Sequence, residues 1–176
     1  MLHSESGETD LALLHLKKAL AIAIEVGDRL GVGICEGYLG SVYRARNEES
    51  LAASHFARAL RVAQEHGDGR FEGVWMANLG CSLRAIGKRE EARTHLLAAE
   101  EMLTETVGRE ENFQSLALLE CMCELGHLES TVDGVRSRLQ AAEAFAEVID
   151  ASPDEETLGM FRELREYLAS FADTTC

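Results

Sequence analysis

The 176-residue chain contains a single proline, Pro153, and only 6% of its residues are aromatic. Proteins built of strands and turns use more of both, so these shortages favour helices. Long apolar runs are also missing, since no stretch approaches the roughly 20 residues that a membrane span needs. The first residues, MLHSESGETD, lack the basic and apolar segments of a secretory signal. We therefore expect an all-α, cytoplasmic protein without a membrane partner.

Basic residues are in the minority, because 17 Lys and Arg face 31 Asp and Glu and give a net charge of −14. Such a charge repels phosphate backbones, so we expect no nucleic-acid partner. The acidity is uneven: residues 1–100 carry 12 basic and 14 acidic side chains, and residues 101–176 carry 5 and 17. We interpret the acidic C-terminal part as a solubilising cap, or alternatively as a contact for a basic partner.

What the chain does contain is a repeat with a period of 40 residues. HLKKAL at 15–20 aligns with HFARAL at 55–60 and HLLAA at 95–99, and Gly27-Asp28 aligns with Gly67-Asp68. Each period holds two helical patterns separated by a short polar break. The predicted helices span 8–26, 33–46, 49–66, 73–86, 89–107, 112–125, 130–150 and 154–171. Such helix pairs bury their apolar faces only by stacking on their neighbours.

These repeats resemble the tetratricopeptide repeat in its longer form of about 40 residues. Leu39-Gly40 with Tyr43, and Leu79-Gly80 with Leu83, match the first helix of that family. The second helix is matched by Ala12-Leu16-Ala19, Ala52-Phe56-Ala59 and Ala92-Leu96-Ala99. The usual proline at the repeat end is missing, and a Gly-Asp turn with several extra residues takes its place. The resemblance implies a right-handed superhelix of antiparallel helix pairs.

We expect one domain over residues 1–176, with about eight helices. Clear repeats cover 7–127, a divergent helix that loses the alanine pattern covers 128–151, and a capping helix covers 152–173. Ser152-Pro153 has the features of that last helix's start. Glu120 stands 40 residues after Gly80, so we expect the packing of the fourth first helix to differ there.

The N-terminal helix is predicted to lack a partner, because Gly7 aligns with the break at Asn47 and Gly87. Two explanations stay open. The sequence is the C-terminal piece of a longer array, or the apolar side of residues 11–24 pairs with another protein or a second copy, which gives a homodimer through residues 8–26.

The five cysteines form no disulfide framework, so we expect free thiols in the helical core. His15, His55 and His95 occupy one repeat position, but helices 8–10 Å apart cannot bring three equivalent side chains to one zinc ion. We expect half-buried packing instead. Cys121 and Cys123 lack the spacing of a zinc site.

Two further motifs are incomplete. Glu124 and His127 have the spacing of a di-iron helix, but no second such pair exists and Gly126 is expected to end the helix. Gly31-Val-Gly33 follows no strand, so it is not a phosphate loop, and we expect it to begin the second helix pair. We expect no catalytic, cofactor-binding or metal-binding residues and no enzymatic activity.

The resemblance implies that first helices line a concave groove where partners bind. Its candidate binding residues are Tyr38, Ser41, Arg44, Asn78, Arg84 and Gln114. Other positions expected in the groove are Ile34, Gly37, Val74, Ala77, Cys81, Ala117, Leu118, Cys121 and Glu124. Asn78 matches an asparagine that holds a peptide backbone in related arrays. The only tryptophan, Trp75, is expected to be buried between helices.

Arg44 and Arg84 form a basic ladder that can meet a carboxylate. The alternative is that they pair with Glu36, Glu48 or Glu72. Gly37, Ala77 and Ala117 stand where the carboxylate clamp of chaperone-tail receptors has larger polar groups, so a helix or an extended apolar peptide is the favoured ligand.

These observations predict a non-catalytic scaffold for protein–protein interaction, which binds a peptide or helix without a cofactor. The alternative is a regulatory or oligomerisation segment of a larger signalling ATPase or kinase. In that case the open face of the N-terminal helix is the working surface.

Overall fold

The computed structural model describes the backbone of residues 2–106, 112–148 and 155–173, and the side chains of 9–105, 115, 117–146 and 158–170. Within these ranges every regular element is an α-helix, which confirms the expected fold class. The helices are α1 (Leu2–Val26), α2 (Arg29–Ala45), α3 (Glu49–His66), α4 (Gly69–Ala85), α5 (Arg89–Thr106), α6 (Asn112–Leu128), α7 (Val132–Val148) and α8 (Glu155–Asp173).

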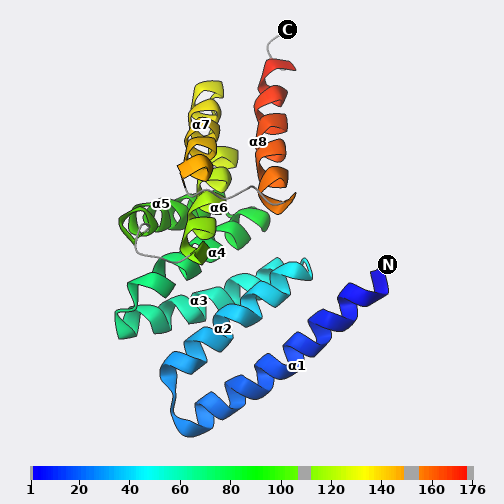
Figure 1. Cartoon of the computed structure of the whole chain (residues 1–176), viewed down its shortest axis with the longest axis vertical. Helices are drawn as coiled ribbons and strands as arrows, with labels where there is room; N and C mark the ends of the chain where they lie inside the picture. Colours follow the sequence, from blue (N-terminus) through cyan, green and yellow to red (C-terminus); the bar gives the residue numbers. More distant parts are fainter. Residues whose placement is uncertain (1, 107–111, 149–154, 174–176) are drawn as a thin grey trace.

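The helices follow one another as sequential antiparallel pairs (Figure 1). Each helix packs against the next one along the chain, and α4 also packs against α6, and α6 against α8. This arrangement is that of a solenoid, in which each pair completes the core of its neighbour. Among the described residues, no helix is long and apolar enough to cross a membrane.

The repeated Gly-Asp dipeptide makes the joint between pairs. Gly67 ends α3 in the left-handed conformation, with φ at 68°, which glycine adopts without steric cost. The carboxylate of Asp68 then accepts a hydrogen bond from the backbone N–H of Phe71 and caps α4. Asp28 caps α2 in the same way, so α2 begins at Arg29 instead of residue 33, and Gly31 and Gly33 lie inside it.

Within a pair, a glycine on the first helix lets a large side chain of the second helix approach its backbone. A Cβ atom on Gly40 would lie 2.8 Å from Cδ1 of Phe56, and one on Gly80 would lie 2.6 Å from Cγ of Leu96. The small and large residues of the resemblance are fully buried in α3 and α5: Ala52, Phe56, Ala59, Ala92, Leu96 and Ala99. The packing pattern that the family resemblance implies is therefore present in these two pairs.

The repeat lengthens in the second half of the chain. Helix α4 begins 40 residues after α2, whereas α6 begins 43 residues after α4, and α8 begins 43 residues after α6. The expectation that Glu120 replaces the glycine was therefore wrong by three residues. Cys123 occupies that place, buried in one cluster with Leu139 of α7, and Glu120 is on the side of α6 that meets α2.

The same shift aligns the buried residues of α7 with those of α5. Moving 43 residues on from Ala92, Leu96 and Ala99 leads to buried residues in α7: Val135, Leu139 and Ala142. The alanine pattern expected to be lost in this helix is thus lost at its first position, where Val135 stands, and kept at its second, Ala142. The packing of α6 against α7 follows the same rule as that of α4 against α5.

Other predicted helix ends also differ from the structure. Helix α1 begins at Leu2 and continues through Gly7 without a break, although a start near residue 8 was expected. Helix α6 continues past Gly126 to Leu128. A Cβ on Gly126 would lie 2.7 Å from Cδ1 of Leu164, so this glycine lets α8 approach α6 and does not end the helix. Ser152-Pro153 lies outside the described residues.

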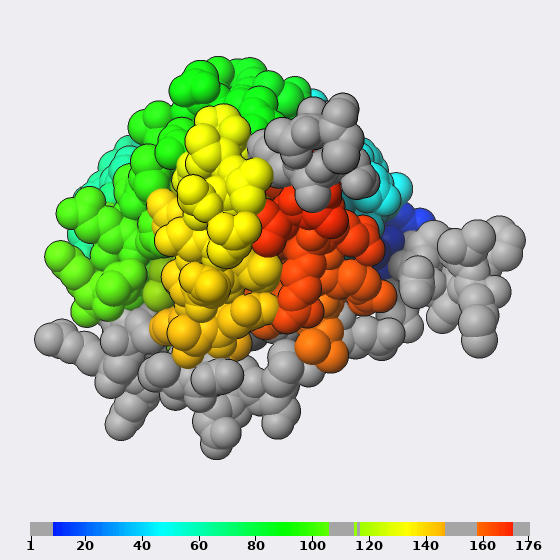
Figure 2. Space-filling view, turned by 90° about the horizontal axis from the view of Figure 1, so that it is seen from above, coloured from blue at the N-terminus to red at the C-terminus, as the bar shows by residue number. Residues whose placement is uncertain are grey.

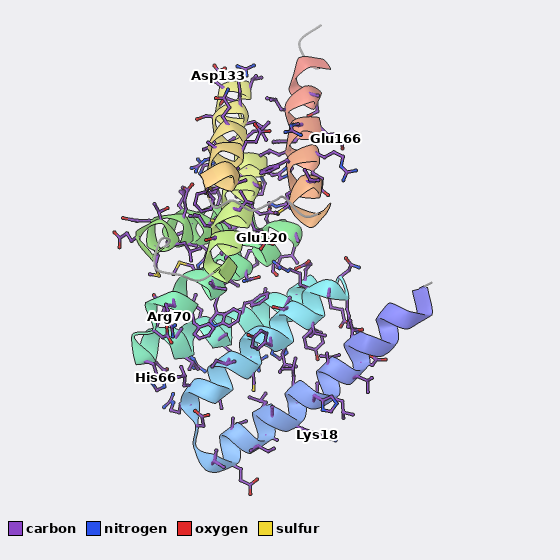
Figure 3. All side chains as sticks on the ribbon, in the orientation of Figure 1. Lys18, His66, Arg70, Glu120, Asp133 and Glu166 are labelled. Carbon is purple, nitrogen blue, oxygen red and sulfur yellow. The ribbon has the colours of Figure 1, made fainter. Side chains whose placement is uncertain are left out.

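The core consists of two clusters, one spanning α3 to α6 and one spanning α6 to α8. Figure 2 shows α7 and α8 next to each other at the C-terminal end of the array. Leu119 and Cys123 of α6 are buried, but the residues 43 positions later on α8 are Arg162 and Glu166, both exposed. Glu166 points away from the other helices (Figure 3). The outer face of α8 is therefore charged, as a capping helix requires.

Candidate functional site

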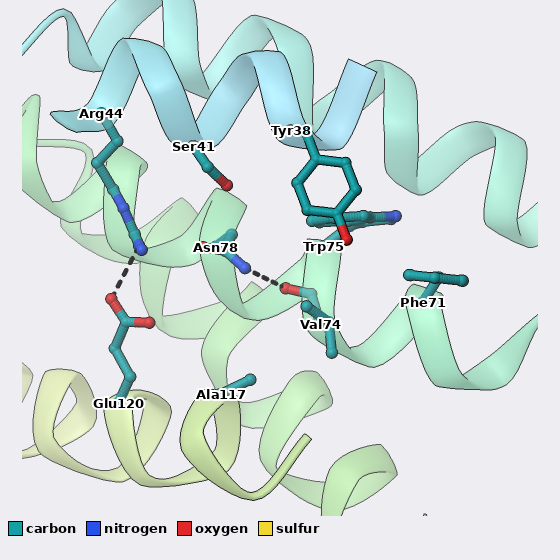
Figure 4. A pocket seen from close by; sticks show the side chains of 9 residues that line it. All are labelled: Tyr38, Ser41, Arg44, Phe71, Val74, Trp75, Asn78, Ala117 and Glu120. Atoms are coloured by element: carbon teal, nitrogen blue, oxygen red, sulfur yellow. Dashed lines mark hydrogen bonds and ion pairs between the residues drawn. The ribbon is translucent and has the colours of Figure 1, made fainter. Parts of the chain in front are cut away.

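A pocket of about 310 Å³ lies between the first helices of three successive pairs. As Figure 4 shows, α4 forms its floor, and α2 and α6 form its two walls. Nine residues line it: Tyr38, Ser41, Arg44, Phe71, Val74, Trp75, Asn78, Ala117 and Glu120. The volume equals that of roughly ten water molecules, which is room for one long side chain. The lining is mostly apolar with a few polar groups, as is typical of ligand sites.

An aromatic group forms the apolar part of the pocket. Trp75 is 4% exposed, which confirms its expected burial. Its indole stacks with the ring of Phe71 at 5.6 Å between centroids, and Tyr38 meets it edge-on at 6.1 Å. A Cβ on Gly37 would lie 2.4 Å from the indole, so a glycine at this position lets the indole pack against the backbone of α2. Tyr38 itself is 51% exposed at the rim.

The small polar side chains of the pocket each direct one donor into their own helix. The hydroxyl of Ser41 donates to the carbonyl of Gly37 at 3.4 Å. The amide of Asn78, a buried residue, donates through Nδ2 to the carbonyl of Val74 at 2.9 Å. Both groups therefore present oxygen atoms that still accept hydrogen bonds.

An ion pair closes one end of the pocket. Nη1 of Arg44 on α2 donates to Oε1 of Glu120 on α6 at 2.8 Å, and both side chains are about a quarter exposed. The two residues are 76 positions apart in the chain, so this ion pair joins α2 directly to α6. Figure 3 places Glu120 where α6 approaches the first two helix pairs. The groove is therefore a pocket with an end wall at this point.

Arg84 forms a parallel pair with Glu124, in which Nη2 donates to Oε1 at 3.0 Å. The alternative that the two arginines pair with Glu36, Glu48 or Glu72 named the wrong partners, since both pair with glutamates of α6. Those three carboxylates lie elsewhere: Glu36 contacts His55 and Arg58, Glu48 contacts Arg46, and Glu72 accepts from Gln64.

Four of the six candidate residues line one pocket: Tyr38, Ser41, Arg44 and Asn78. Arg84 is on α4 and does not line it, and the side chain of Gln114 lies outside the described residues. Sequence reasoning missed Phe71 and Glu120. Glu120 was missed because the period lengthens between α4 and α6. A shift of 43 residues, instead of 40, aligns Glu120 with the groove position Ala77.

The histidines that share a repeat position have separate environments. His15 is exposed. His55 is partly buried, and its Nδ1 atom is hydrogen-bonded to Oε2 of Glu36 at 2.6 Å. His95 is also partly buried, and burial lowers its pKa. Within the described ranges, no three His, Cys, Asp or Glu side chains are placed to hold a metal ion.

The described cysteines are free thiols, and three of them are buried. Burial raises the pKa of Cys123 to about 12, and it also raises those of Cys81 and Cys121. The thiol of Cys121 donates to the carbonyl of Leu96 at 2.9 Å. Since the thiolate is the reactive form, these groups behave as apolar core residues, as expected for Cys121 and Cys123.

The fold and the pocket define an all-α protein of stacked antiparallel helix pairs with a lined hollow on its first helices. Residues 1–65 match the family model described as tetratricopeptide repeat. The resemblance seen in the sequence is thereby confirmed. Repeats of this family act as protein–protein interaction modules and are typically non-catalytic. The comparison with curated proteins finds no match.

Proposed function

We propose that the chain is a non-catalytic, cytoplasmic scaffold of signalling or assembly, which binds a peptide or helix of a partner protein in the pocket between α2, α4 and α6. One observation carries this proposal: four residues chosen from the sequence as binding residues line a single pocket of about 310 Å³. The aromatic floor supports an anchor side chain, because a few buried anchors dominate the affinity of most interfaces.

The polar rim supports recognition of the partner's backbone. Asn78 offers a carbonyl oxygen, Ser41 offers a hydroxyl oxygen, and the hydroxyl of the half-exposed Tyr38 can donate as well as accept. The end wall of Arg44 and Glu120 limits the length of groove that one straight segment can occupy. We infer that the partner inserts an anchor side chain and does not run through the groove.

Filling the pocket tests this proposal. Peptides of twelve residues are selected from a random phage-displayed library on the wild-type protein, and their affinities are measured by calorimetry. The variant Ser41→Phe projects a ring into the pocket and is expected to weaken binding at least tenfold, or about 1.4 kcal/mol. The matched control Ser54→Phe lies exposed on α3, outside the pocket, and should leave affinity unchanged. Equal loss in both variants, or none in Ser41→Phe, contradicts the proposal.

A second candidate is self-association through residues 8–26, as in a regulatory segment of a larger signalling ATPase or kinase. It is favoured by the exposure of α1. Ile22 is 59% exposed, whereas Val62, the equivalent residue of α3, is 6% exposed. Leu14, Ile24 and Val26 are exposed where α3 carries the polar residues Ser54, Gln64 and His66. A helix with apolar residues on nearly all sides is typically buried.

Sedimentation velocity tests this second candidate. Self-association predicts a mass above that of the monomer. The substitution Ile22→Glu should abolish the association and return the mass to that of the monomer. The control Leu51→Glu changes an exposed leucine of α3 and should preserve the association. A wild-type monomer at every concentration rejects this candidate and leaves the pocket proposal intact.

A further inference from the structure

Counting donors and acceptors in the pocket gives information about its ligand. Asn78 on the floor donates one of its two amide N–H groups to the carbonyl of Val74 at 2.9 Å, and Ser41 on one wall donates its hydroxyl to the carbonyl of Gly37 at 3.4 Å. Arg44 directs one N–H to Glu120 at 2.8 Å. The oxygens of Asn78 and Ser41 therefore face the cavity as acceptors, and a ligand that donates hydrogen bonds complements them.

Glu120 adds a charged acceptor to this set. Its Oε1 atom accepts from Arg44 at 2.8 Å, and a carboxylate has further lone pairs on both of its oxygens. The side chain is 26% exposed and lines the pocket. A carboxylate accepts about four hydrogen bonds, so Glu120 has the capacity to hold a second donor beside the guanidinium of Arg44.

The aromatic floor and the Tyr38 ring at the rim also suit a cation with an apolar stem. Phe71 and Trp75 stack on each other, and Tyr38 meets the indole edge-on. The faces of such rings attract ammonium and guanidinium groups, and their surfaces pack against the methylene groups of Lys and Arg. The net charge of −14 also draws cationic ligands toward the molecule.

We infer that the pocket binds a basic side chain of the partner, with arginine as the best fit, whose guanidinium donates to Glu120, Asn78 and Ser41 while its stem packs against Trp75 and Val74. This inference rests on the proposed function and specifies its ligand. The guanidinium is favoured because its planar fork can donate to several acceptors at once.

The presence of Arg44 in the same wall is compatible with a second cation. The molecule already contains carboxylates shared by two positive groups. Glu129 lies 3.5 Å from Arg93 and 3.8 Å from Arg138 through the same oxygen atom. Glu120 would likewise be shared by two cations, Arg44 and the ligand, although with one oxygen for each.

A matched pair of small probes tests the inference. Because Trp75 is the only tryptophan, its indole N–H gives a single NMR resonance from a residue that lines the pocket. N-acetyl-L-arginine amide should shift this resonance in a saturable way. The citrulline analogue, which has nearly the same shape without the charge, should bind about tenfold more weakly. N-acetyl-L-glutamic acid amide should cause no saturable shift.

Variants identify the carboxylate that is responsible. Glu120→Gln should reduce the preference for arginine over citrulline to about twofold or less. Glu124→Gln removes the equivalent partner of Arg84, outside the pocket, and should retain the full preference. Ser41→Asp adds a carboxylate on the wall and should raise the affinity for the arginine probe alone. This variant keeps the inference testable if Glu120→Gln disturbs the fold.

Several results would overturn the inference: equal binding of arginine and citrulline, tighter binding of the glutamate probe, no saturable shift with arginine, or a preference that Glu120→Gln leaves unchanged. If library-selected peptides still lose affinity in Ser41→Phe, the proposed function survives these results. In that case the anchor is apolar and packs against Trp75, or it is acidic and Arg44 binds it.

Discussion

At the scale of single residues, one hydroxyl in the core stands out. Ser82 on α4 is fully buried, and its Oγ atom has no hydrogen-bond partner within the described residues. The equivalent residue of α2, 40 positions earlier, is Val42. A buried polar group without a partner costs the free energy of its desolvation. Ser82 therefore lowers stability without contributing to the pocket.

Ser82→Ala is expected to raise the free energy of unfolding by about 1 kcal/mol, because it removes the unsatisfied hydroxyl. Urea denaturation measures the change. Alanine also has the higher helix propensity, so Ser54→Ala on the exposed side of α3 serves as the control for that smaller contribution. A gain in Ser82→Ala no larger than in Ser54→Ala contradicts this account.

Two partly buried histidines predict how stability depends on pH. Burial lowers the pKa of His95 and His127, and the nearby Arg84 lowers that of His127 further. An imidazole in the unfolded chain takes up its proton near pH 6.5. Below that pH the unfolded state binds more protons than the folded state, so the free energy of unfolding falls as the pH decreases. Above about pH 7 these groups contribute no slope.

The double variant His95→Gln/His127→Gln should show a smaller loss of stability between about pH 7.5 and 5.5 than the wild type. Urea denaturation at several pH values measures this slope. His66→Gln changes an exposed histidine of α3 and provides the control. An unchanged slope in the double variant shows that the two buried imidazoles do not determine the pH dependence.

At the scale of helices, the contact of a glycine with a large side chain determines how closely a pair packs. Gly40 meets Phe56 and Gly80 meets Leu96 across the α2–α3 and α4–α5 contacts. Gly80→Ala is expected to lower the free energy of unfolding by about 1–3 kcal/mol through overpacking, despite alanine's better helix propensity.

Gly69 provides the control for Gly80→Ala. It begins α4, and a Cβ on it would meet nothing within 4 Å, so Gly69→Ala should be neutral or slightly stabilising. Thermal unfolding compares the two variants. If Gly80→Ala is as stable as the wild type, the close approach of α4 and α5 does not depend on this glycine.

Most helices could be predicted from the sequence, because apolar spacing and the Gly-Asp joints are local signals. The register of α6 and α7 could not be predicted, since it depends on the length of a connection. Two residues, Gly67-Asp68, join α3 to α4, whereas 107–111 separate α5 from α6. The three additional positions carry no motif, so a fixed offset of 40 placed Glu120 on the wrong side of α6. The buried set Val135, Leu139 and Ala142 shows the correct offset.

At the scale of the whole molecule, the contacts of the pocket depend on how the array curves. Tyr38, Ser41 and Asn78 could be assigned to the groove because their place in the repeat determines which side of the helix they occupy. The pairing of Arg44 with Glu120 could not be foreseen. It joins the first helices of the second and fourth pairs, counting α1 as part of the first, and their approach depends on superhelical curvature.

The two ends of the described array differ in chemistry. Helix α1 exposes Leu11, Leu14, Ile22, Ile24 and Val26. Helix α8 exposes Arg162 and Glu166, which are equivalent to the buried residues Leu119 and Cys123 of α6. An apolar face and a charged face do not complement each other, so this contrast disfavours head-to-tail stacking of copies. Binding at the pocket and burial of α1 are therefore separate questions.

The central claim is that partners bind in the pocket between α2, α4 and α6. The most direct test is a ¹H–¹⁵N NMR titration of the full chain with a library-selected peptide. The account predicts that the Trp75 indole resonance shifts together with the backbone amides of residues 38–44, 74–78 and 117–120, which surround the pocket. Shifts confined to residues 9–26 of α1, with the indole resonance unmoved, would contradict it.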